Sequence, residues 1–285
     1  MIMEPLHVAV APAIPPAALS ALGISVCGYQ EVSTTSVVRL EPSSAYAKII
    51  LVLDGAITLG EQSSDHSRRE HQVGLWVPAG HAPVCAGHGG TITCVELLLP
   101  PWVSRMIQGE LAGDSTIALE DVGAMRGEQL VQRMAATPDW SARFDLVNIA
   151  IHDAVSKSAR IPCREVLNVW KRLESSAGQI SIRDLAREVG WSERYLAQRF
   201  FNDVGLLPKL ASRQMRFMRT HQLVCGSTMP LADISQLGGY ADQSHMTREF
   251  THFAGAGPAT IRQARFESLA GTSAELVHAK TRRRG

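Results

Sequence analysis

The sequence predicts an α+β protein with an antiparallel β-structure first and an all-helical domain last. Up to Pro100, short apolar runs are separated by polar or Gly/Pro-rich clusters about every ten residues, which is typical of an antiparallel sandwich or barrel. From Trp102 onward, apolar residues recur at helical spacing. Two similar segments follow residue 180. With 285 residues, the chain is long enough for two ordinary domains.

We expect four consecutive parts. A β-rich domain occupies residues 1–100, a helical linker or dimerisation region residues 101–175, an all-α domain residues 176–268 and a flexible basic tail residues 269–285. The expected strands are the runs SVVRL, AKIILVL, AITL, VGLWV and TITCVELLL, separated by turns such as EPSS, PAGHAP and AGHGG.

Charge is distributed unevenly along the chain. Residues 1–159 hold 16 acidic and 9 basic side chains, and residues 160–285 hold 11 acidic and 19 basic ones, so the net charge of +1 conceals an acidic and a basic half. The asymmetry suggests that the second half meets a polyanion and the first does not, although chance segregation gives the same pattern.

Several classes of protein are disfavoured by what the sequence lacks. The five cysteines are scattered and form no CxxC pair, which excludes a disulfide framework and a zinc site of the usual spacing and favours the reducing cytoplasm. Cys85 and Cys94 are either a redox pair or buried apolar residues. No GxSxG, Walker, GxGxxG or HExxH motif is present, so we expect neither an enzyme nor a cofactor. Prolines within the uncharged stretch Pro5–Gln30 argue against a membrane anchor.

Three amphipathic segments in the middle of the chain are predicted to be helices: ALEDVGAMRGEQLVQRMAA, DWSARFDLVNIAIHDAVSK and CREVLNVWKRLESS. Their apolar faces consist of Met125, Leu130, Val131 and Met134; of Phe144, Val147 and Ile151; and of Val166, Val169, Trp170 and Leu173. Gly178 supports a C-cap after the third segment. These helices either link a sensor to an effector domain or form a packing or dimerisation surface.

The repeat after residue 180 carries most of the functional argument. IRDLAREVGWSERYLAQRFFNDVGLLP matches LADISQLGGYADQSHMTREFTHFAGAGP at an offset of 49 residues before a turn and 50 residues after it. The turn glycine, the N-cap, the inward-facing residues and the following proline are Gly190, Ser192, Leu196, Phe200, Val204 and Pro208 in the first copy and Gly239, Asp242, Met246, Phe250, Phe253 and Pro258 in the second. This is the length and punctuation of a helix-turn-helix.

The solvent-facing residues of the second helix in each copy are the candidate base readers. They are Arg194, Ala197 and Gln198 in the first copy and Gln243, Ser244, Thr247 and Arg248 in the second. Arg pairs with guanine, Gln with adenine, Ser and Thr with either, and Ala contacts a thymine methyl. The helix between the copies supplies Lys209, Arg213, Arg216 and Arg219, which contact phosphates or form its solvated face. The tail KTRRRG makes non-specific contacts or has no role.

Residues 180–265 resemble the DNA-binding domain of the AraC/XylS transcription regulators, and GGYADQSHMTREFTHFAGAGP resembles the signature of that family over its full length. The resemblance implies two helix-turn-helix units joined by a long helix, with the second helix of each in adjacent major-groove segments of promoter DNA. It assigns base reading to the same seven positions and implies RNA polymerase as a partner. Ala197 stands where a longer polar reader could, so we expect weaker discrimination by the first unit. Helical hairpins that bind no DNA are the alternative.

A second resemblance concerns the first domain, where VGLWVPAGHAPV resembles the Pro-x-Gly segment of a cupin barrel, a sensor that many AraC-type regulators carry. It implies a small-molecule effector, with Trp76 and His81 as candidate pocket residues, and leaves a homodimer open. We expect no metal site, because His66, His71, His81 and His88 include no HxH pair. The alternatives are a cupin-type metal-dependent enzyme with an accessory DNA-binding module and a ligand-independent regulator whose barrel only dimerises or contacts a protein.

Overall fold

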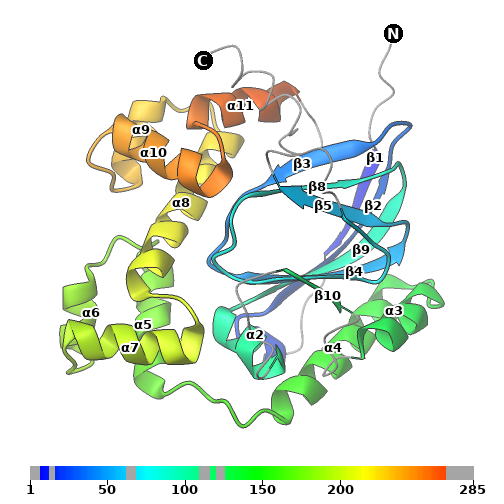
Figure 1. Ribbon diagram of the computed structural model, residues 1–285, viewed down its shortest axis with the longest axis horizontal. Helices are drawn as coiled ribbons and strands as arrows, with labels where there is room; N and C mark the ends of the chain where they lie inside the picture. Colours follow the sequence, from blue (N-terminus) through cyan, green and yellow to red (C-terminus); the bar gives the residue numbers. More distant parts are fainter. Residues whose placement is uncertain (1–6, 13–16, 62–68, 109–115, 120–125, 268–285) are drawn as a thin grey trace. The chain divides into compact units, whose positions relative to one another are not determined.

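The computed structural model describes residues 7–12, 17–61, 69–108, 116–119 and 126–267, which fall into two compact units (Figure 1). The N-terminal unit consists of most residues up to Ile161, and the C-terminal unit consists of the residues from Pro162 together with the short segments Arg39–Ala45 and Ala82–Cys85. The first is rich in strands and the second is helical, which confirms the predicted α+β class. Across these described ranges, no helix has both the length and the apolar character needed to cross a membrane.

Two sheets make up the β-structure of the N-terminal unit. The larger has the strand order β1-β2-β9-β4-β7-β10 and the smaller the order β3-β8-β5-β6. The strands are β1 (His7–Pro12), β2 (Ser25–Val32), β3 (Val37–Glu41), β4 (Ala47–Asp54), β5 (Ile57–Glu61), β6 (Arg69–His71), β7 (Gly74–Val77), β8 (Val84–His88), β9 (Ile92–Leu99) and β10 (Ile117–Ala118). All five predicted runs are strands. The predicted runs do not include β1, β2, β6, β8 or β10. In β2 and β8, glycine and polar residues interrupt the apolar pattern of SVCGYQEV and VCAGH.

Side chains of the larger sheet alternate between its two faces. One buried cluster lies between the sheets, because it combines residues of β4, β7 and β9 of the larger sheet with Ile57 of β5 in the smaller one. Its members are Ile50, Val52, Ile57, Leu75, Val77, Ile92 and Cys94, and Tyr29 of β2 and Leu59 of β5 pack against them. Burial raises the pKa of the Cys94 thiol to about 12, so it stays a neutral, apolar group at physiological pH. This favours the buried-residue interpretation of that cysteine over a redox one.

Three helices cover the other face of the larger sheet (Figure 1): α2 (Pro101–Gln108), α3 (Gly127–Ala135) and α4 (Trp140–Ser156). Gly28 in β2 makes room for the Trp140 ring, since a Cβ at this position would lie 2.2 Å from it. The predicted apolar faces of α3 and α4 are confirmed by the burial of Leu130, Val131, Met134, Phe144, Val147 and Ile151. Met125, predicted to share the first of these faces, lies outside the described residues. A short helix α1 (Ala17–Ala21) precedes β2.

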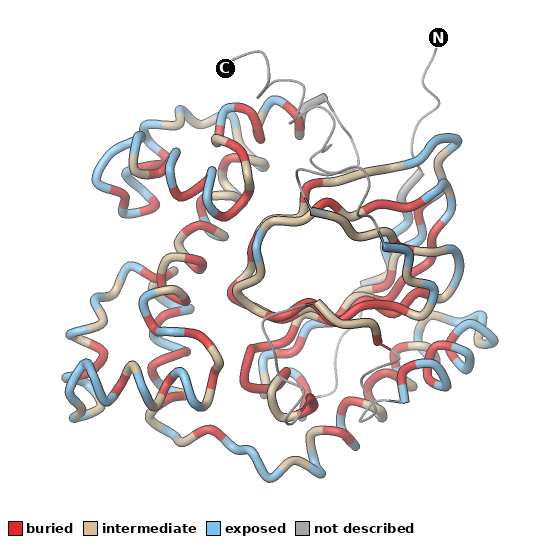
Figure 2. The backbone as a smooth tube through the Cα atoms, viewed as in Figure 1, coloured by how far each residue is buried: buried red, intermediate tan, exposed pale blue. Residues whose placement is uncertain are grey.

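The C-terminal unit is a chain of seven helices within its described residues. They are α5 (Arg164–Ser175), α6 (Ile182–Glu188), α7 (Glu193–Val204), α8 (Pro208–Gly226), α9 (Leu231–Leu237), α10 (Gln243–Ala254) and α11 (Pro258–Glu267). The pairs α6–α7 and α9–α10 are the two predicted helix-turn-helix units, and α8 is the long helix between them (Figure 1). Buried and exposed stretches alternate along each of these helices, as Figure 2 shows. Helix α5 belongs to this unit, so the segment 101–175 is divided between the two units.

The turns and caps of the two helix-turn-helix units form at the predicted residues. Gly190 and Gly239 have φ angles of 73° and 67°, a left-handed conformation that a Cβ makes costly. Ser192 Oγ accepts a hydrogen bond from the Tyr195 N–H at 3.2 Å, and Asp242 Oδ1 accepts one from the His245 N–H at 2.6 Å. These are the expected N-caps of α7 and α10. The predicted inward residues, Leu196, Phe200, Val204, Met246, Phe250 and Phe253, are all buried.

Candidate nucleic-acid interface

The seven predicted base readers lie on the outer faces of two equivalent helices. Arg194 and Gln198 on α7 are exposed and Ala197 beside them is half-buried, whereas Gln243, Ser244, Thr247 and Arg248 on α10 are all exposed. The opposite faces of both helices are buried in the C-terminal unit. Each set of readers is therefore presented on one helical face, the arrangement that a major groove accepts.

The polar groups of these readers differ in how free they are. Arg194 and Arg248 make no hydrogen bond or ion pair with any other described residue, so both guanidinium groups are available. The Gln198 side-chain amide donates to Asn202 Oδ1 at 3.0 Å, which leaves it one N–H and its oxygen. The Thr247 hydroxyl donates to the Gln243 carbonyl at 2.9 Å and presents its lone pairs and methyl group outward.

One further residue of this face escapes the sequence pattern. Phe201 follows Gln198 by three residues and Arg194 by seven, so it continues the same helical ridge, and 47 % of it is exposed. An exposed phenylalanine here can contact a thymine methyl group. The signal in the sequence is the Phe200-Phe201 pair, of which an amphipathic helix buries only one member.

The four cations predicted on α8 fall into two classes. Lys209 and Arg219 are exposed and have no partner among the described residues, so they are free to meet phosphates. Arg213 instead forms a two-pronged ion pair with Glu249 of α10, with Nη2–Oε1 and Nε–Oε1 distances of 2.7 and 3.1 Å. Arg216 donates to the Gly178 carbonyl at 3.1 Å and lies 5.7 Å from the centre of the Tyr240 ring. The last two therefore hold helices together in this structure.

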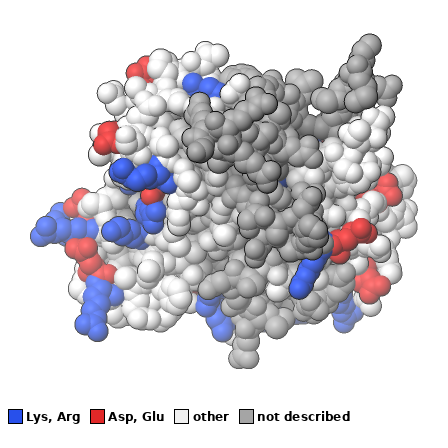
Figure 3. Space-filling view, turned by 45° about the horizontal axis from the view of Figure 1, so that its top comes forward, with Lys and Arg blue, Asp and Glu red and all other residues white. Residues whose placement is uncertain are grey.

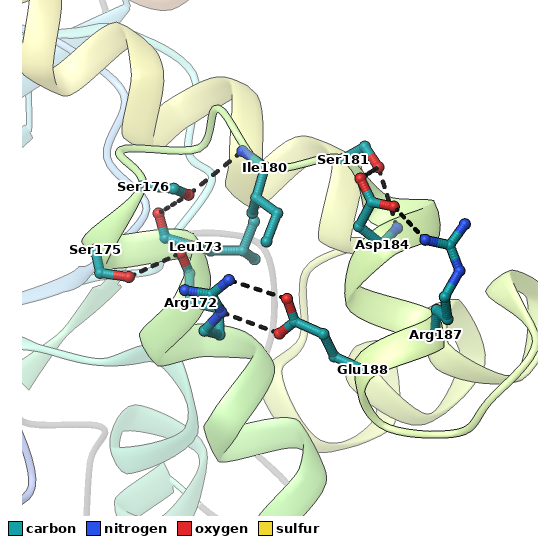
Figure 4. A network of polar contacts seen from close by, with 9 residues as sticks. All are labelled: Arg172, Leu173, Ser175, Ser176, Ile180, Ser181, Asp184, Arg187 and Glu188. Atoms are coloured by element: carbon teal, nitrogen blue, oxygen red, sulfur yellow. Dashed lines mark hydrogen bonds and ion pairs between the residues drawn. The ribbon is translucent and has the colours of Figure 1, made fainter.

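The first helix-turn-helix is anchored to α5 by a polar network (Figure 4). Arg172 of α5 donates two hydrogen bonds to Glu188 of α6, at 2.9 and 3.0 Å, and this bonding raises the pKa of Arg172 and lowers that of Glu188. The Ser181 hydroxyl caps α6 and donates to Asp184 Oδ2 at 2.6 Å, which is the main cause of the lowered pKa of Asp184. Helix α6 thus supports α7 from a fixed position on α5.

The electrostatic character of the C-terminal unit is mixed. Figure 3 shows its Lys and Arg side chains interspersed with Asp and Glu in that view, with no single continuous basic face. The basic tail predicted to add affinity lies outside the described residues. Of the described cations that the sequence predicts to contact DNA, Arg194, Arg248, Lys209 and Arg219 make no ion pair with another described residue.

Trp76, one of the two candidate effector residues of the N-terminal unit, does not belong to the cluster between the sheets. Trp76 is completely buried, and its indole N–H donates to Ser104 Oγ of α2 at 3.0 Å, whereas its neighbours Leu75 and Val77 belong to the cluster between the sheets. Trp76 therefore packs against a helix, and strand alternation gives no support to its predicted place in a pocket. His81 is half-buried in the turn after β7. The pocket stays a prediction.

The histidines considered for a metal site are dispersed. His88 Nε2 lies 2.9 Å from Glu31 Oε2, and both side chains are buried, so this pair connects β8 to β2. His71 ends β6, and His66 lies outside the described residues. Within the ranges that the structure describes, no three His, Cys, Asp or Glu side chains gather as metal ligands would.

The comparison with protein-family models points to the C-terminal part of the chain. A family model described as a helix-turn-helix domain matches residues 185–264. The HTH-type transcriptional regulator ExsA of Pseudomonas aeruginosa is 23 % identical over 149 residues, which are 52 % of this chain and 50 % of that protein. The chain thus matches about half the length of this curated relative.

Two solved structures are also similar. ToxT from Vibrio cholerae has a TM-score of 0.47 and 10 % identity, covering 85 % of this chain and 98 % of that one. The C-terminal domain of AraT, a response regulator from Geobacillus stearothermophilus, has a TM-score of 0.34 and 17 % identity, covering 36 % and 86 %. Helices α6–α7 and α9–α10, on either side of α8, fall almost entirely within the residues that the family model matches, so the C-terminal part of this chain is a helix-turn-helix domain.

Proposed function

We propose that this chain is a sequence-specific transcription regulator that binds double-stranded promoter DNA, with α7 and α10 in two adjacent major-groove segments. The observation that carries the proposal is the pair of equivalent, N-capped helices whose inner faces are buried and whose outer faces present unpaired polar and cationic groups. Arginine, glutamine, serine and threonine on such a face match the donors and acceptors of base edges.

In this proposal, the polar residues of α7, α8 and α10 contact bases, contact phosphates or hold neighbouring elements of the domain in place. The seven readers of α7 and α10, joined by Phe201, contact bases. Lys209 and Arg219 of α8 contact phosphates, because both are exposed and unpaired among the described residues. Arg213 and Arg216 keep their intramolecular partners and act on DNA only through the helices they hold.

The remaining parts of the chain are assigned by the same proposal. Residues 1–100 sense a small-molecule effector, residues 101–175 relay its binding or dimerise, residues 176–268 read DNA in the cytoplasm and contact RNA polymerase, and residues 269–285 add non-specific affinity. The charge distribution supports this division, since the basic excess lies after residue 160.

Binding-site selection from random duplex DNA by the full-length chain tests the proposal. We expect two short motifs centred about 10 base pairs apart, because two recognition helices on one face of the duplex read the groove about one turn, or 34 Å, apart. Affinity should fall steeply with added salt, because binding releases counterions from the phosphates and this release is less favourable at a higher salt concentration. Repeating the selection with and without cell extract would reveal an effector. Absence of any salt-resistant preference over random duplex would overturn the proposal.

Replacing Arg248 with alanine should relax the preference at one base pair of the selected site. Arg248 is exposed, unpaired among the described residues and placed to meet guanine, so its loss should reduce discrimination at that position by about 1–3 kcal/mol. Competition binding against the four variants of that base pair measures the change. Arg219→Ala is the matched control, expected to weaken binding to all four variants alike; an unchanged base preference in Arg248→Ala removes this residue from the readers.

A further inference from the structure

The turn between α5 and α6 lies at the junction of the two helix-turn-helix units. The Gly178 carbonyl of this turn accepts hydrogen bonds from Ser212 Oγ at 2.7 Å and from Arg216 Nη2 at 3.1 Å, both from α8. Gly178 is itself buried, and a Cβ on it would lie 2.0 Å from the Ser212 carbonyl oxygen. The turn that leads into the first helix-turn-helix therefore packs directly against α8 and is hydrogen-bonded to it.

The same turn also contacts the second helix-turn-helix. The Gln179 side-chain amide donates to the carbonyl of Leu237 at 2.9 Å, and Leu237 is the last residue of α9. A Cβ on Gly239, in the α9–α10 turn, would lie 3.3 Å from the Gln179 side chain. Two consecutive residues, Gly178 and Gln179, thus bind α8 and the end of α9.

Arg216 of α8 contacts both the α5–α6 turn and Tyr240, which follows the α9–α10 turn. Its guanidinium reaches the Gly178 carbonyl and lies over the ring of Tyr240, the buried residue that leads from the α9–α10 turn toward the recognition helix α10. The Tyr240 hydroxyl lies 3.4 Å from Thr220 Oγ1 of α8. The position of α10 relative to α6 is consequently determined by a few polar contacts around Arg216 and Gln179, in addition to apolar packing.

We propose that Arg216 and Gln179 are positioning residues that set the spacing and phase between the two recognition helices, and hence the separation of DNA half-sites that this chain accepts. The inference rests on the proposed DNA-binding function. One inserted base pair moves a half-site by about 3.4 Å and turns it by about 35° around the duplex. A rigid junction rejects such a shift, whereas a loosened one lets α10 follow it.

The test measures binding of the full-length chain to the selected site with zero, one or two base pairs inserted or deleted between its half-sites. For the wild-type chain, one base pair either way should weaken binding about tenfold or more, the cost of one poorly matched contact. Gln179→Ala and Arg216→Met should cut this penalty to about threefold at most, because α10 is then free to adjust. Gln179 is exposed, so its replacement leaves the fold intact.

Two controls separate positioning from a general loss of stability or charge. Arg219→Met removes the same charge from the same helix at an exposed, unpaired position and should weaken binding equally at every spacing. Arg216→Lys, which keeps a donor toward Gly178, should restore part of the spacing penalty. A spacing profile in Gln179→Ala and Arg216→Met that parallels the wild-type profile overturns the inference while the proposed function stands. A wild-type chain that selects no site overturns the proposed function instead, and the inference with it.

Discussion

Phe200→Ala is expected to lower the free energy of unfolding of the C-terminal unit by about 3–5 kcal/mol, the range for truncating a fully buried phenylalanine. Phe200 has no exposed surface, and its ring stacks on that of Trp170 at 6.3 Å with an interplanar angle of 20°. It therefore joins the first recognition helix to α5. Trp170, which contacts the Phe200 ring, is itself fully buried, and this limits how far the site can collapse around an alanine.

The adjacent Phe201 is the matched control for this substitution. Because 47 % of Phe201 is exposed, Phe201→Ala should change the free energy of unfolding by no more than about 0.5 kcal/mol. It should instead weaken the preference for thymine at one position of the selected site. Chemical denaturation followed by circular dichroism measures the first effect and competition binding the second. Equal destabilisation by the two substitutions would contradict the burial assigned to this pair.

Gly178→Ala is expected to destabilise the C-terminal unit by about 3–5 kcal/mol, combining left-handed strain with the loss of buried hydrogen bonds. Gly178 has a φ of 71°, and its added Cβ would lie 2.0 Å from the Ser212 carbonyl oxygen. The backbone must then move away from α8, which breaks the bonds that Ser212 and Arg216 donate to the Gly178 carbonyl.

Gly190→Ala isolates the strain from the close approach. Gly190 has a similar φ of 73°, but a Cβ there would meet nothing within 4 Å. Its replacement should cost only the left-handed conformation, about 1–2 kcal/mol. The difference between the two glycine variants in denaturation midpoint reports the contact between the turn and α8. Equal costs at both positions would show that this contact contributes little and would weaken the case for a rigid junction.

The partners of the four cations on α8 could not be predicted from the sequence. Lys209, Arg213, Arg216 and Arg219 are alike in sequence, each a cation on one long helix. Two of them pair with groups that are distant along the chain: Glu249 lies 36 residues from Arg213, and Gly178 lies 38 residues from Arg216. Periodicity describes one helix at a time, so it does not show which partner another helix will bring.

In the N-terminal unit, too, some features depend on contacts that are distant in sequence and could not be predicted. Strands β4 and β9 are evident as apolar runs, but β2 is not, because Gly28 and polar neighbours interrupt it. That glycine is explained by the Trp140 ring that packs on it from α4, more than a hundred residues away in sequence. Likewise, the orientation of Trp76 toward Ser104 follows from the position of α2 and not from the VGLWV run.

The sequence by itself determined the α+β class, both helix-turn-helix units, their turn glycines and N-caps, and the outward faces of the two recognition helices. All of these depend on interactions within a few residues along the chain, which composition and period reveal directly. Only the tertiary structure decided that Arg213 and Arg216 bind groups on other helices and turns, whereas Lys209 and Arg219 have no partner among the described residues. It also decided that Gly178 and Gln179 form a junction between the two helix-turn-helix units. These assignments depend on which backbone and side-chain groups, distant in sequence, come into contact. A polar group that is removed from water needs a hydrogen-bond partner, and the identity of that partner does not follow from the periodicity of the sequence.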